Sequence, residues 1–464
     1  MKLKTIFKTA KWYLASSFIT KLFVFFQLSL LAKNITPSDM GVIDSLSSIS
    51  QLLMLFISLH LDAAIARIYH FKKNDFDKLS EFFSTNFLFI LAYGVTVLIF
   101  VHLMASESIA TFLKTEKYLV FFSFSPILFI QLNNLLIVLL KQQLKSKIIF
   151  RLDLIQSIIT TSVMTGIIFW TEIDLYSKFI GMLIAQFILL LITIYLTFTQ
   201  RLLRFRFSKT ILYESLLYSI PLLPNMVGGW VHDLSDRLVI GKYFSMKMVG
   251  IYAIANQVAK IVYILQDVFT KILGPQELSI LVEDYDKGKK LAIFMATKFF
   301  ALFSLFHIII ALFSNEIVLL ISTKEYLFSF HLIAILSYSF VVASLYRLYL
   351  PFLQYKKKLW IVSCAGIGSA ILNLLLNIKY VPVYGIWAAS FSTVFSFIFY
   401  TFFIISYVEK KYKVDFPIRS IIEIFSVELF FYFLSTIYFD SIIYRVGIIL
   451  SFLGVLKWRR YIQF

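Results

Sequence analysis

Polar side chains recur along one otherwise apolar stretch, residues 41–62, with the sequence GVIDSLSSISQLLMLFISLHLD. Wound as an α-helix at about 3.6 residues per turn, this stretch places its polar groups in one narrow sector. These groups are Asp44, Ser48, Gln51, Ser58 and Asp62. A helix of this length can cross a bilayer, where carboxylates and amides are excluded from the hydrocarbon. The sequence therefore predicts a wall of hydrogen-bonding groups that faces protein or water.

The same segment recurs later in the chain at a constant shift. Thr36 falls on Ser245, and the motif NDFDK falls on EDYDK. Under this shift the polar positions fall on a second apolar helix with a polar face. That face carries Asn256, Gln257, Lys260, Asp267 and Lys271. Two polar faces in register across a duplication predict two half-transporters that line one pathway.

The composition indicates an integral membrane protein. Of 464 residues 60% are hydrophobic and 15% charged, and the mean hydropathy is +0.84. The net charge of +18 arises from 44 basic and 26 acidic residues. Most basic residues fall in alternate connecting segments and at both ends, which predicts cytoplasmic termini and makes nucleic acid an unneeded partner. The single cysteine, Cys364, excludes an intrachain disulfide and a multi-cysteine metal site.

About 14 apolar runs are long enough to span a bilayer, so an all-α polytopic membrane fold is expected. The first run is too long for a signal peptide and is expected to stay as the first helix. The duplication predicts two six-helix lobes, residues 1–206 and 207–410, followed by two additional helices within 411–464. Because six is even, the repeats are parallel and can enclose a central cavity. No connecting segment is long enough for a catalytic domain, which disfavours a membrane polymerase or ligase.

Lys21, Lys260 and Lys298 lie within predicted helices, where an ammonium is costly unless it is hydrated or paired. Lys21 and Lys260 are expected to line the cavity, together with Lys271. Pairing of Lys21 with a neighbouring helix is the alternative. For the second polar helix, the alternative is a structural pair between Asp267 and Lys271. Lys260 would then extend to the membrane surface.

Two stretches are expected to act as gates or hinges. In LDAAIAR, Asp62 and Arg67 form either a cytoplasmic gate or headgroup contact, or a structural pair at the interface. In SIPLLPNMVGGWVHDLSDR, Pro221 and Pro224 bend or unwind a helix within the membrane. At its end Asp236 and Arg237 are expected near the outer face, as an extracellular gate or as helix caps.

No catalytic or metal-binding pattern emerges. The Asp-x-Asp motifs at Asp75 and Asp284 occur in equivalent connecting segments, which indicates a solvated connector rather than a metal site. The six histidines lack metal-ligand spacing, and no nucleotide motif is present. No cofactor is expected, while coupling to Na⁺, H⁺ or the membrane potential stays open, with Asp44, Asp62 and Asp267 as acceptors. The intramembrane residues Asn133, Asn134, Asn373 and Arg347 are expected to hold helices together.

Three segments carry a resemblance to a known family. They read LAKNITPSDMGVIDSLSSISQLL, LDAAIARIY and LSDRLVIGKYFSMKMVGIYAIANQV. The chain resembles the polysaccharide transporters, the Wzx-type flippases, of the multidrug/oligosaccharidyl-lipid/polysaccharide (MOP) exporter superfamily. The resemblance implies a V-shaped, two-lobed fold. It also implies transfer of an undecaprenyl-diphosphate-linked oligosaccharide across the bacterial inner membrane, for O-antigen, capsule or exopolysaccharide synthesis.

Such a cargo combines an anionic diphosphate, a polar glycan and a long lipid. We expect Lys21 and Lys260 to neutralise the diphosphate while the lobes rock between two access states. The expected partners are membrane lipids and the polymerase and chain-length proteins of the same pathway. The alternatives are a cation-coupled drug exporter and a flippase for peptidoglycan or teichoic precursors. An O-antigen polymerase or ligase is the alternative from a different class.

Overall fold

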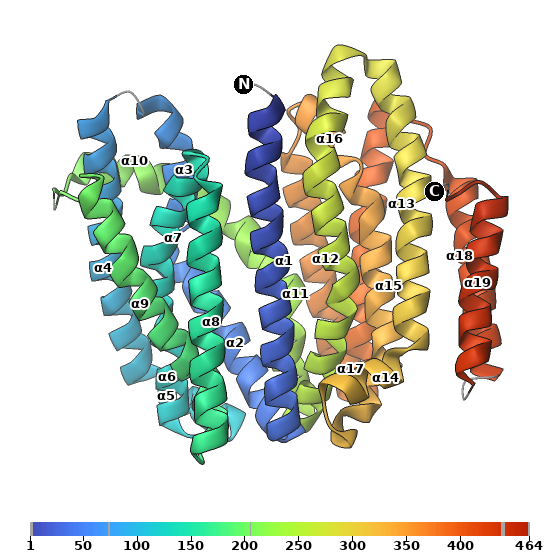
Figure 1. Ribbon diagram of the computed structural model, residues 1–464, viewed down its shortest axis with the longest axis horizontal. Coiled ribbons are helices and arrows are strands. Elements are labelled where there is room, and N and C mark those ends of the chain that lie inside the picture. The colour runs from blue at the N-terminus through green and yellow to red at the C-terminus, as the bar shows by residue number, and fades with distance from the viewer. Residues whose placement is uncertain (1–2, 73–74, 205, 438–440, 463–464) are drawn as a thin grey trace. The chain divides into compact units, whose positions relative to one another are not determined.

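The computed structural model describes residues 3–72, 75–204, 206–437 and 441–462, which form helices and no strand. The chain divides into two compact units, Met1–Trp230 and Val231–Phe464. In each unit the long helices run along a common direction (Figure 1). The helices of the first unit are α1 (Leu3–Asn34), α2 (Pro37–Ser58), α3 (Leu61–Lys72), α4 (Phe76–Met104), α5 (Ser106–Leu113), α6 (Lys117–Phe124), α7 (Pro126–Gln142), α8 (Ser146–Trp170), α9 (Ser177–Thr199) and α10 (Lys209–Ser219).

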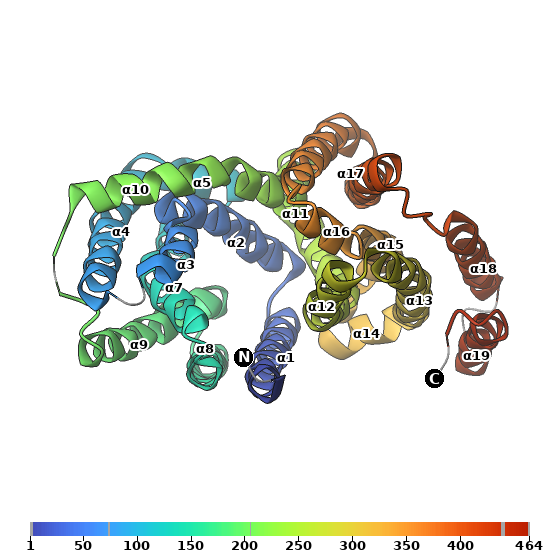
Figure 2. The same cartoon turned by 90° about the horizontal axis from the view of Figure 1, so that it is seen from above.

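The helix α11 (Leu223–Tyr243) contains the boundary between the units. The second unit continues with α12 (Met246–Glu283), α13 (Tyr285–Leu312), α14 (Ser314–Ile321), α15 (Phe330–Arg347), α16 (Leu350–Tyr355), α17 (Trp360–Tyr412), α18 (Ile418–Ile437) and α19 (Ile442–Trp458). Three 3₁₀ turns complete the described elements: Asp174–Tyr176, Ile220–Leu222 and Lys324–Ser329. Seen from above, α18 and α19 lie beside each other at one edge of this unit (Figure 2), and both pack against α13.

Within the described ranges, ten helical segments are long and apolar enough to cross a membrane. The all-α polytopic fold is therefore confirmed. One of the ten, α17, contains two of the predicted runs, 359–376 and 385–407, in a single element. The predicted runs 212–234, 418–438 and 442–456 are not among the ten, and the helix of the last, α19, has only 17 residues.

The duplicated segments begin their helices in the same way. The Thr36 hydroxyl caps α2 by accepting from the Asp39 N–H, and the Ser245 hydroxyl caps α12 by accepting from the Met248 N–H. Asp75 and Asp284, the first residues of the two Asp-x-Asp motifs, cap α4 and α13 by accepting from the N–H three residues on. A side-chain acceptor at this position satisfies an otherwise unbonded amide. The motif is thus used for helix initiation in both copies.

The duplicated helices differ further along. The predicted single helix 41–62 is wrong, because α2 ends at Ser58 and α3 starts at Leu61. Leu59 and His60 have positive φ angles of 45° and 56°, and the Ser58 hydroxyl accepts from the His60 N–H. In the second copy α12 continues without a break to Glu283. Asp62 therefore lies on a different helix from Asp44 and does not share its face.

The helix α17 is made of two limbs joined at Gly385. This glycine has φ 60° and ψ −140°, whereas the residues on either side are helical. A Cβ atom at this position would lie 3.2 Å from the ring of Phe244. Both the backbone conformation and the close ring favour glycine. Gly385 therefore allows the two limbs to fold back against each other.

Candidate functional site

The predicted polar wall on α2 contains side chains with different surroundings. The Ser48 side chain is 1% exposed, and its hydroxyl donates to the Asp44 carbonyl at 2.9 Å. The Ser48 carbonyl in turn accepts from the Trp230 indole at 2.8 Å. Gln51 is exposed, and its amide makes only a long bond of 3.4 Å to the Ser47 carbonyl. Gln51 is therefore accessible to a ligand, whereas the Ser48 hydroxyl is buried in its own helix.

A lysine that the sequence analysis did not single out joins this wall. The Lys178 ammonium, at the start of α9, donates to the Ser47 hydroxyl at 2.8 Å and lies within electrostatic reach of Asp44. Lys178 is half-buried. An apolar run that begins at Phe179 gave no signal that the preceding lysine turns inward. The first unit thus holds a cation beside the α2 polar residues that sequence reasoning missed.

The other predicted cation of this unit, Lys21, lies half-buried in the middle of α1. The helix α1 packs against α8, and polar side chains join the two helices. The Ser16 hydroxyl donates to the Asp153 carboxylate, and the Gln27 amide donates to the Thr161 hydroxyl at 2.8 Å. The polar positions of α1 on either side of Lys21 are thus used in helix packing.

Asp62 and Arg67, the predicted cytoplasmic gate, have separate neighbours. The Asp62 carboxylate pairs with the His60 ring at 3.1 Å, and the Arg67 guanidinium stacks on the Tyr218 ring at 4.5 Å. The hydrogen bond to Asp62 raises the pKa of His60 above its usual value. Burial opposes ionisation of Asp62, but the bond and charge of His60 outweigh it and lower the pKa of this carboxyl. The pair fixes the turn between α2 and α3.

The prolines Pro221 and Pro224 lie where the helix bend was predicted. The helix α10 ends at Ser219, a 3₁₀ turn follows at Ile220–Leu222, and α11 starts at Leu223. The break predicted from the prolines is confirmed, and its use as a hinge stays a prediction. The compact units divide after Trp230, whereas the duplication was placed at residue 206. The cause is that α10 packs against α3 and α4 of the first unit.

Asp236 and Arg237 lie inside the second unit, with side chains 3% and 1% exposed. Their guanidinium–carboxylate contact is 2.6 Å, and the Tyr252 hydroxyl also donates to Asp236. The Asn256 side-chain oxygen, in the amide orientation that fits its neighbours, accepts from Arg237 at 2.6 Å. The protein encloses both charges, and their use as an extracellular gate stays a prediction. They form a buried network between α11 and α12.

Three of the other polar residues predicted on α12 are less enclosed. Gln257, Lys260 and Asp267 are half-buried. The side chain of Lys271 lies outside the described residues. The Asp233 side chain of α11 is 61% exposed and lies within electrostatic reach of Lys260 and Arg237. Asp267 interacts electrostatically with Arg347 of α15, whose guanidinium also stacks on Tyr263 at 4.6 Å. A polar ligand can thus reach Lys260 and Gln257 of α12.

A further polar chain runs from α11 into both limbs of α17. The His232 ring contacts Asp233 through Nδ1 at 3.2 Å and the Ser396 hydroxyl through Nε2 at 3.0 Å. The Asn373 amide reaches Ser396 at 3.5 Å, and the Asn377 amide donates to Asn373 at 3.0 Å. The sequence analysis gave this histidine no role, because Ser396 lies 164 residues away in the chain. Asn373 holds helices together, as predicted.

Asn133 has the same structural role in the first unit. Its amide donates to the carbonyl and side-chain oxygens of Gln186, and its oxygen accepts from Thr193 at 2.8 Å. These bonds join α7 to α9. No group of three or more His, Cys, Asp or Glu side chains suited to a metal ion occurs among the residues that the structure describes.

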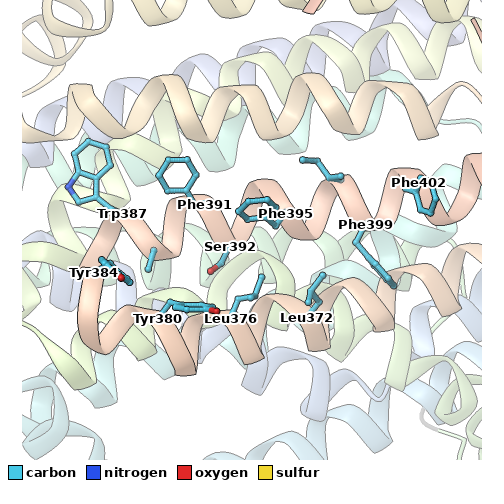
Figure 3. Close-up of a pocket in the computed structure, with 12 residues that line it drawn as sticks. Leu372, Leu376, Tyr380, Tyr384, Trp387, Phe391, Ser392, Phe395, Phe399 and Phe402 are labelled. Atoms are coloured by element: carbon cyan, nitrogen blue, oxygen red, sulfur yellow. The ribbon is translucent and has the colours of Figure 1, made fainter. Parts of the chain in front are cut away.

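A hollow of about 790 Å³ lies between the two limbs of α17 (Figure 3). Leu372, Leu376 and Tyr380 line it from one limb, and Phe391, Phe395 and Phe402 from the other. Its surface is almost wholly apolar, and Ser392 contributes a hydroxyl. A second hollow of about 530 Å³ shares Ile398 and Phe402 with it and extends to Glu409 and Asp415. Hydrocarbon chains such as those of membrane lipids match this surface.

The family comparison matches most of the chain. Residues 30–331 match the model of a polysaccharide biosynthesis protein family. Comparison of the sequence with curated proteins gives no significant match.

Comparison with solved structures identifies the fold. The lipid II flippase MurJ, in an inward closed conformation, matches with a TM-score of 0.79 and 15% identity, covering 97% of this chain and 99% of MurJ. The transporter VcmN of Vibrio cholerae, of the MATE class, matches with a TM-score of 0.61 and 11% identity, covering 89% and 98%. The eukaryotic MATE transporter AtDTX14 matches with a TM-score of 0.58 and 10% identity, covering 88% and 94%. The fold is that of the MOP superfamily transporters.

Proposed function

The chain belongs to the polysaccharide biosynthesis protein family, as a flippase-type transporter of the MOP superfamily, and from that premise we propose that it translocates a lipid-linked oligosaccharide. The carrier is undecaprenyl diphosphate, and the movement is from the cytoplasmic to the outer leaflet of the bacterial inner membrane. The glycan serves O-antigen, capsule or exopolysaccharide synthesis. Both chain termini lie in the cytoplasm.

The proposal rests mainly on the position of Lys260. It is half-buried within a segment, Met246–Thr270, that is apolar enough to cross a membrane. A lysine in such a segment is costly, so its presence indicates a functional use. A diphosphate is a fitting counter-charge. Gln257 on the same helix, and Gln51 on α2, supply hydrogen-bonding groups for the glycan.

The first unit supports the proposal with its own cations. Lys21 lies in the middle of α1, and Lys178 contacts Ser47 on the polar wall of α2. The amphipathic cations that a cation-coupled drug exporter carries would be repelled by these ammonium groups. An anionic cargo is therefore favoured over a cationic drug. Transport by rocking of the two units, with Pro221 and Pro224 as a hinge, is part of the proposal.

A peptidoglycan precursor is the second candidate cargo. The similarity to MurJ, described as a lipid II flippase, favours it, since the match covers nearly the full length of both chains. Lipid II and the oligosaccharide carrier share the diphosphate and the polyprenyl chain. The cationic groups therefore fit both cargoes, and the glycan distinguishes them.

Sidedness of the lipid-linked sugar tests the function. Spheroplasts of a strain that lacks the gene are treated with a membrane-impermeant reagent that oxidises sugars. Accumulation of protected lipid-linked repeat units, reversed by the wild-type gene, is the expected result, and the protected sugar identifies the cargo. Protected lipid II would instead establish the peptidoglycan precursor. Unpolymerised units that are fully accessible would contradict flipping and favour a polymerase or ligase.

A further inference from the structure

Two titratable side chains face each other inside the second unit, between α13 and α18. The His307 Nε2 lies 3.7 Å from the Glu428 Oε1, and the two side chains are 7% and 3% exposed. Within the parts of the chain that the structure describes, neither carboxylate oxygen of Glu428 has a hydrogen-bond partner. The Ser304 hydroxyl lies beside the same carboxyl and is likewise unbonded there. A buried carboxylate without a donor is strongly disfavoured.

The bonds of Ser337 determine which nitrogen of His307 carries a hydrogen. The Ser337 hydroxyl has one hydrogen, which it donates to the Ile333 carbonyl at 2.6 Å. The His307 Nδ1 lies 2.9 Å from the same hydroxyl oxygen. With that hydrogen directed to Ile333, the ring nitrogen that faces the hydroxyl is the donor, and we infer the Nδ1–H tautomer as part of the proposal. A neutral His307 then directs the lone pair of its Nε2 toward Glu428.

Two lone pairs that face each other at this distance require a proton between them. Either Glu428 is a neutral acid that donates to Nε2, or His307 is an imidazolium that donates to a carboxylate. Both descriptions contain one proton. A shift of about 0.7 Å brings the two atoms into ordinary hydrogen-bond range. We propose that His307 and Glu428 form a proton-binding site in which one shared proton fastens α18 to α13.

Other charged and titratable groups near the pair have their own partners. On α15, Tyr338 contacts the His307 ring at a centroid distance of 5.5 Å and lies within electrostatic reach of Glu428. On α19, Arg445 pairs with Glu316 of α14 at 2.7 Å. On α18, Tyr432 follows Glu428 by one turn. On α12, Asp267 interacts with Arg347. On α13 itself, the Lys298 ammonium donates to the Arg460 carbonyl.

The site assigns a role to the two helices that follow the repeat. The pair α18–α19 packs against α13, and the Arg445–Glu316 contact joins α19 to α14. The His307–Glu428 contact differs because it depends on pH. Its proton is retained in the folded chain, whereas Glu and His in an unfolded chain lose theirs near pH 4.3 and 6.5. Between these values the unfolded pair holds one proton, as the folded pair does, so the pair does not change stability with pH. Above about pH 6.5 the unfolded pair loses its proton while the folded pair keeps it, and stability therefore falls with rising pH.

Thermal unfolding of the purified full-length protein between pH 5 and 8.5 tests the site. The measurements use a background with Glu277→Gln and His60→Asn, because Glu277 is a second buried carboxyl and the raised pKa of His60 also makes stability fall above pH 6.5. In this background we expect the Tm to fall above pH 6.5. Glu428→Gln supplies an amide that donates to Nε2 without a titratable proton. We expect this variant to lose the fall above pH 6.5 and to become less stable below it, where the buried neutral imidazole must charge.

Matched variants separate the site from general effects. Glu423→Gln removes another α18 carboxylate, whose partners are Arg459 and Tyr461, and should keep the fall. If Glu428→Gln does not fold, His307→Gln serves instead, since its amide can donate to an ionised Glu428 and should also remove the fall. An unchanged fall in the folded variant would overturn the proposal. If NaCl but not KCl stabilised the protein at constant pH, and Glu428→Gln abolished this effect, the site would bind a sodium ion and not a proton, which would overturn the proposal.

Discussion

The guanidinium of Arg237 lies 2.6 Å from the carboxylate of Asp236, and both side chains are almost fully enclosed in the second unit. Breaking such a pair leaves an uncompensated buried charge. We therefore expect Arg237→Gln to destabilise the protein by roughly 3–5 kcal/mol, measured as loss of folded protein on heating. Asp236→Asn combined with Arg237→Gln should recover part of this loss. Arg151→Gln, at an exposed site of α8, is the control. An Arg237→Gln protein as stable as this control would contradict a structural role for the pair.

The lysines of the two units are expected to act on the cargo. Lys260→Gln and Lys21→Gln remove the ammonium that we assign to the diphosphate, so each should lower glycan export by about tenfold or more at equal protein level. Lys260→Arg and Lys21→Arg keep the charge and should retain more export than the glutamines. Lys247→Gln, at an exposed position of the same α12, is the matched control. Full export by both glutamine variants would refute the assignment of the lysines.

Lys178 is expected to contribute to the same step in the first unit. Because its ammonium donates to Ser47 beside Asp44, Lys178→Gln should weaken export while leaving the helices folded. Lys209→Gln, on the exposed start of α10, provides a comparison. Export should be measured together with thermal stability. If the variant is less stable and its export falls only in proportion to the folded protein that remains, Lys178 acts in the packing of α9 on α2 and not in transport.

Burial of Glu277 makes the stability of the protein depend on pH. Its side chain is buried, one carboxyl oxygen has no hydrogen-bond partner among the described residues, and burial raises its pKa to about 8. The folded chain therefore keeps this proton while the unfolded chain loses it near pH 4.3, so stability falls as pH rises between about 4.3 and 8. Glu277→Gln should be more stable than wild type by roughly 2–4 kcal/mol at pH 8, with little difference near pH 4.5. A difference in Tm that does not change with pH would refute the raised pKa.

Gly385 is the position where the backbone of α17 tolerates substitution least. Gly385→Ala places a Cβ atom 3.2 Å from Phe244 at a φ of 60°, and we expect a loss of roughly 1–3 kcal/mol in stability. Gly447→Ala, which would meet no heavy atom within 4 Å in a regular part of α19, should be neutral or stabilising. Equal Tm values for the two variants would show that the conformation at Gly385 is not required.

The sequence by itself determined the class of the protein and its local helix signals. An apolar run that is long enough to cross a bilayer must satisfy its backbone hydrogen bonds within itself, which favours a helix. Hydropathy alone therefore predicts the polytopic fold. The duplicated caps Thr36 and Ser245, and Asp75 and Asp284, were visible as a constant shift, because capping depends only on residues three positions apart. The prolines Pro221 and Pro224 predicted the helix break for the same local reason.

Only the tertiary structure decided which polar side chains meet. The break at Leu59 and His60 removes Asp62 from the face of Asp44, and no glycine or proline announces it. His232 reaches Ser396, and His307 reaches Glu428, across large sequence separations. Helical periodicity gives the face on which a residue lies but not the helix that covers that face. The partners of buried polar groups are set by packing between helices, and they became known only from the folded chain.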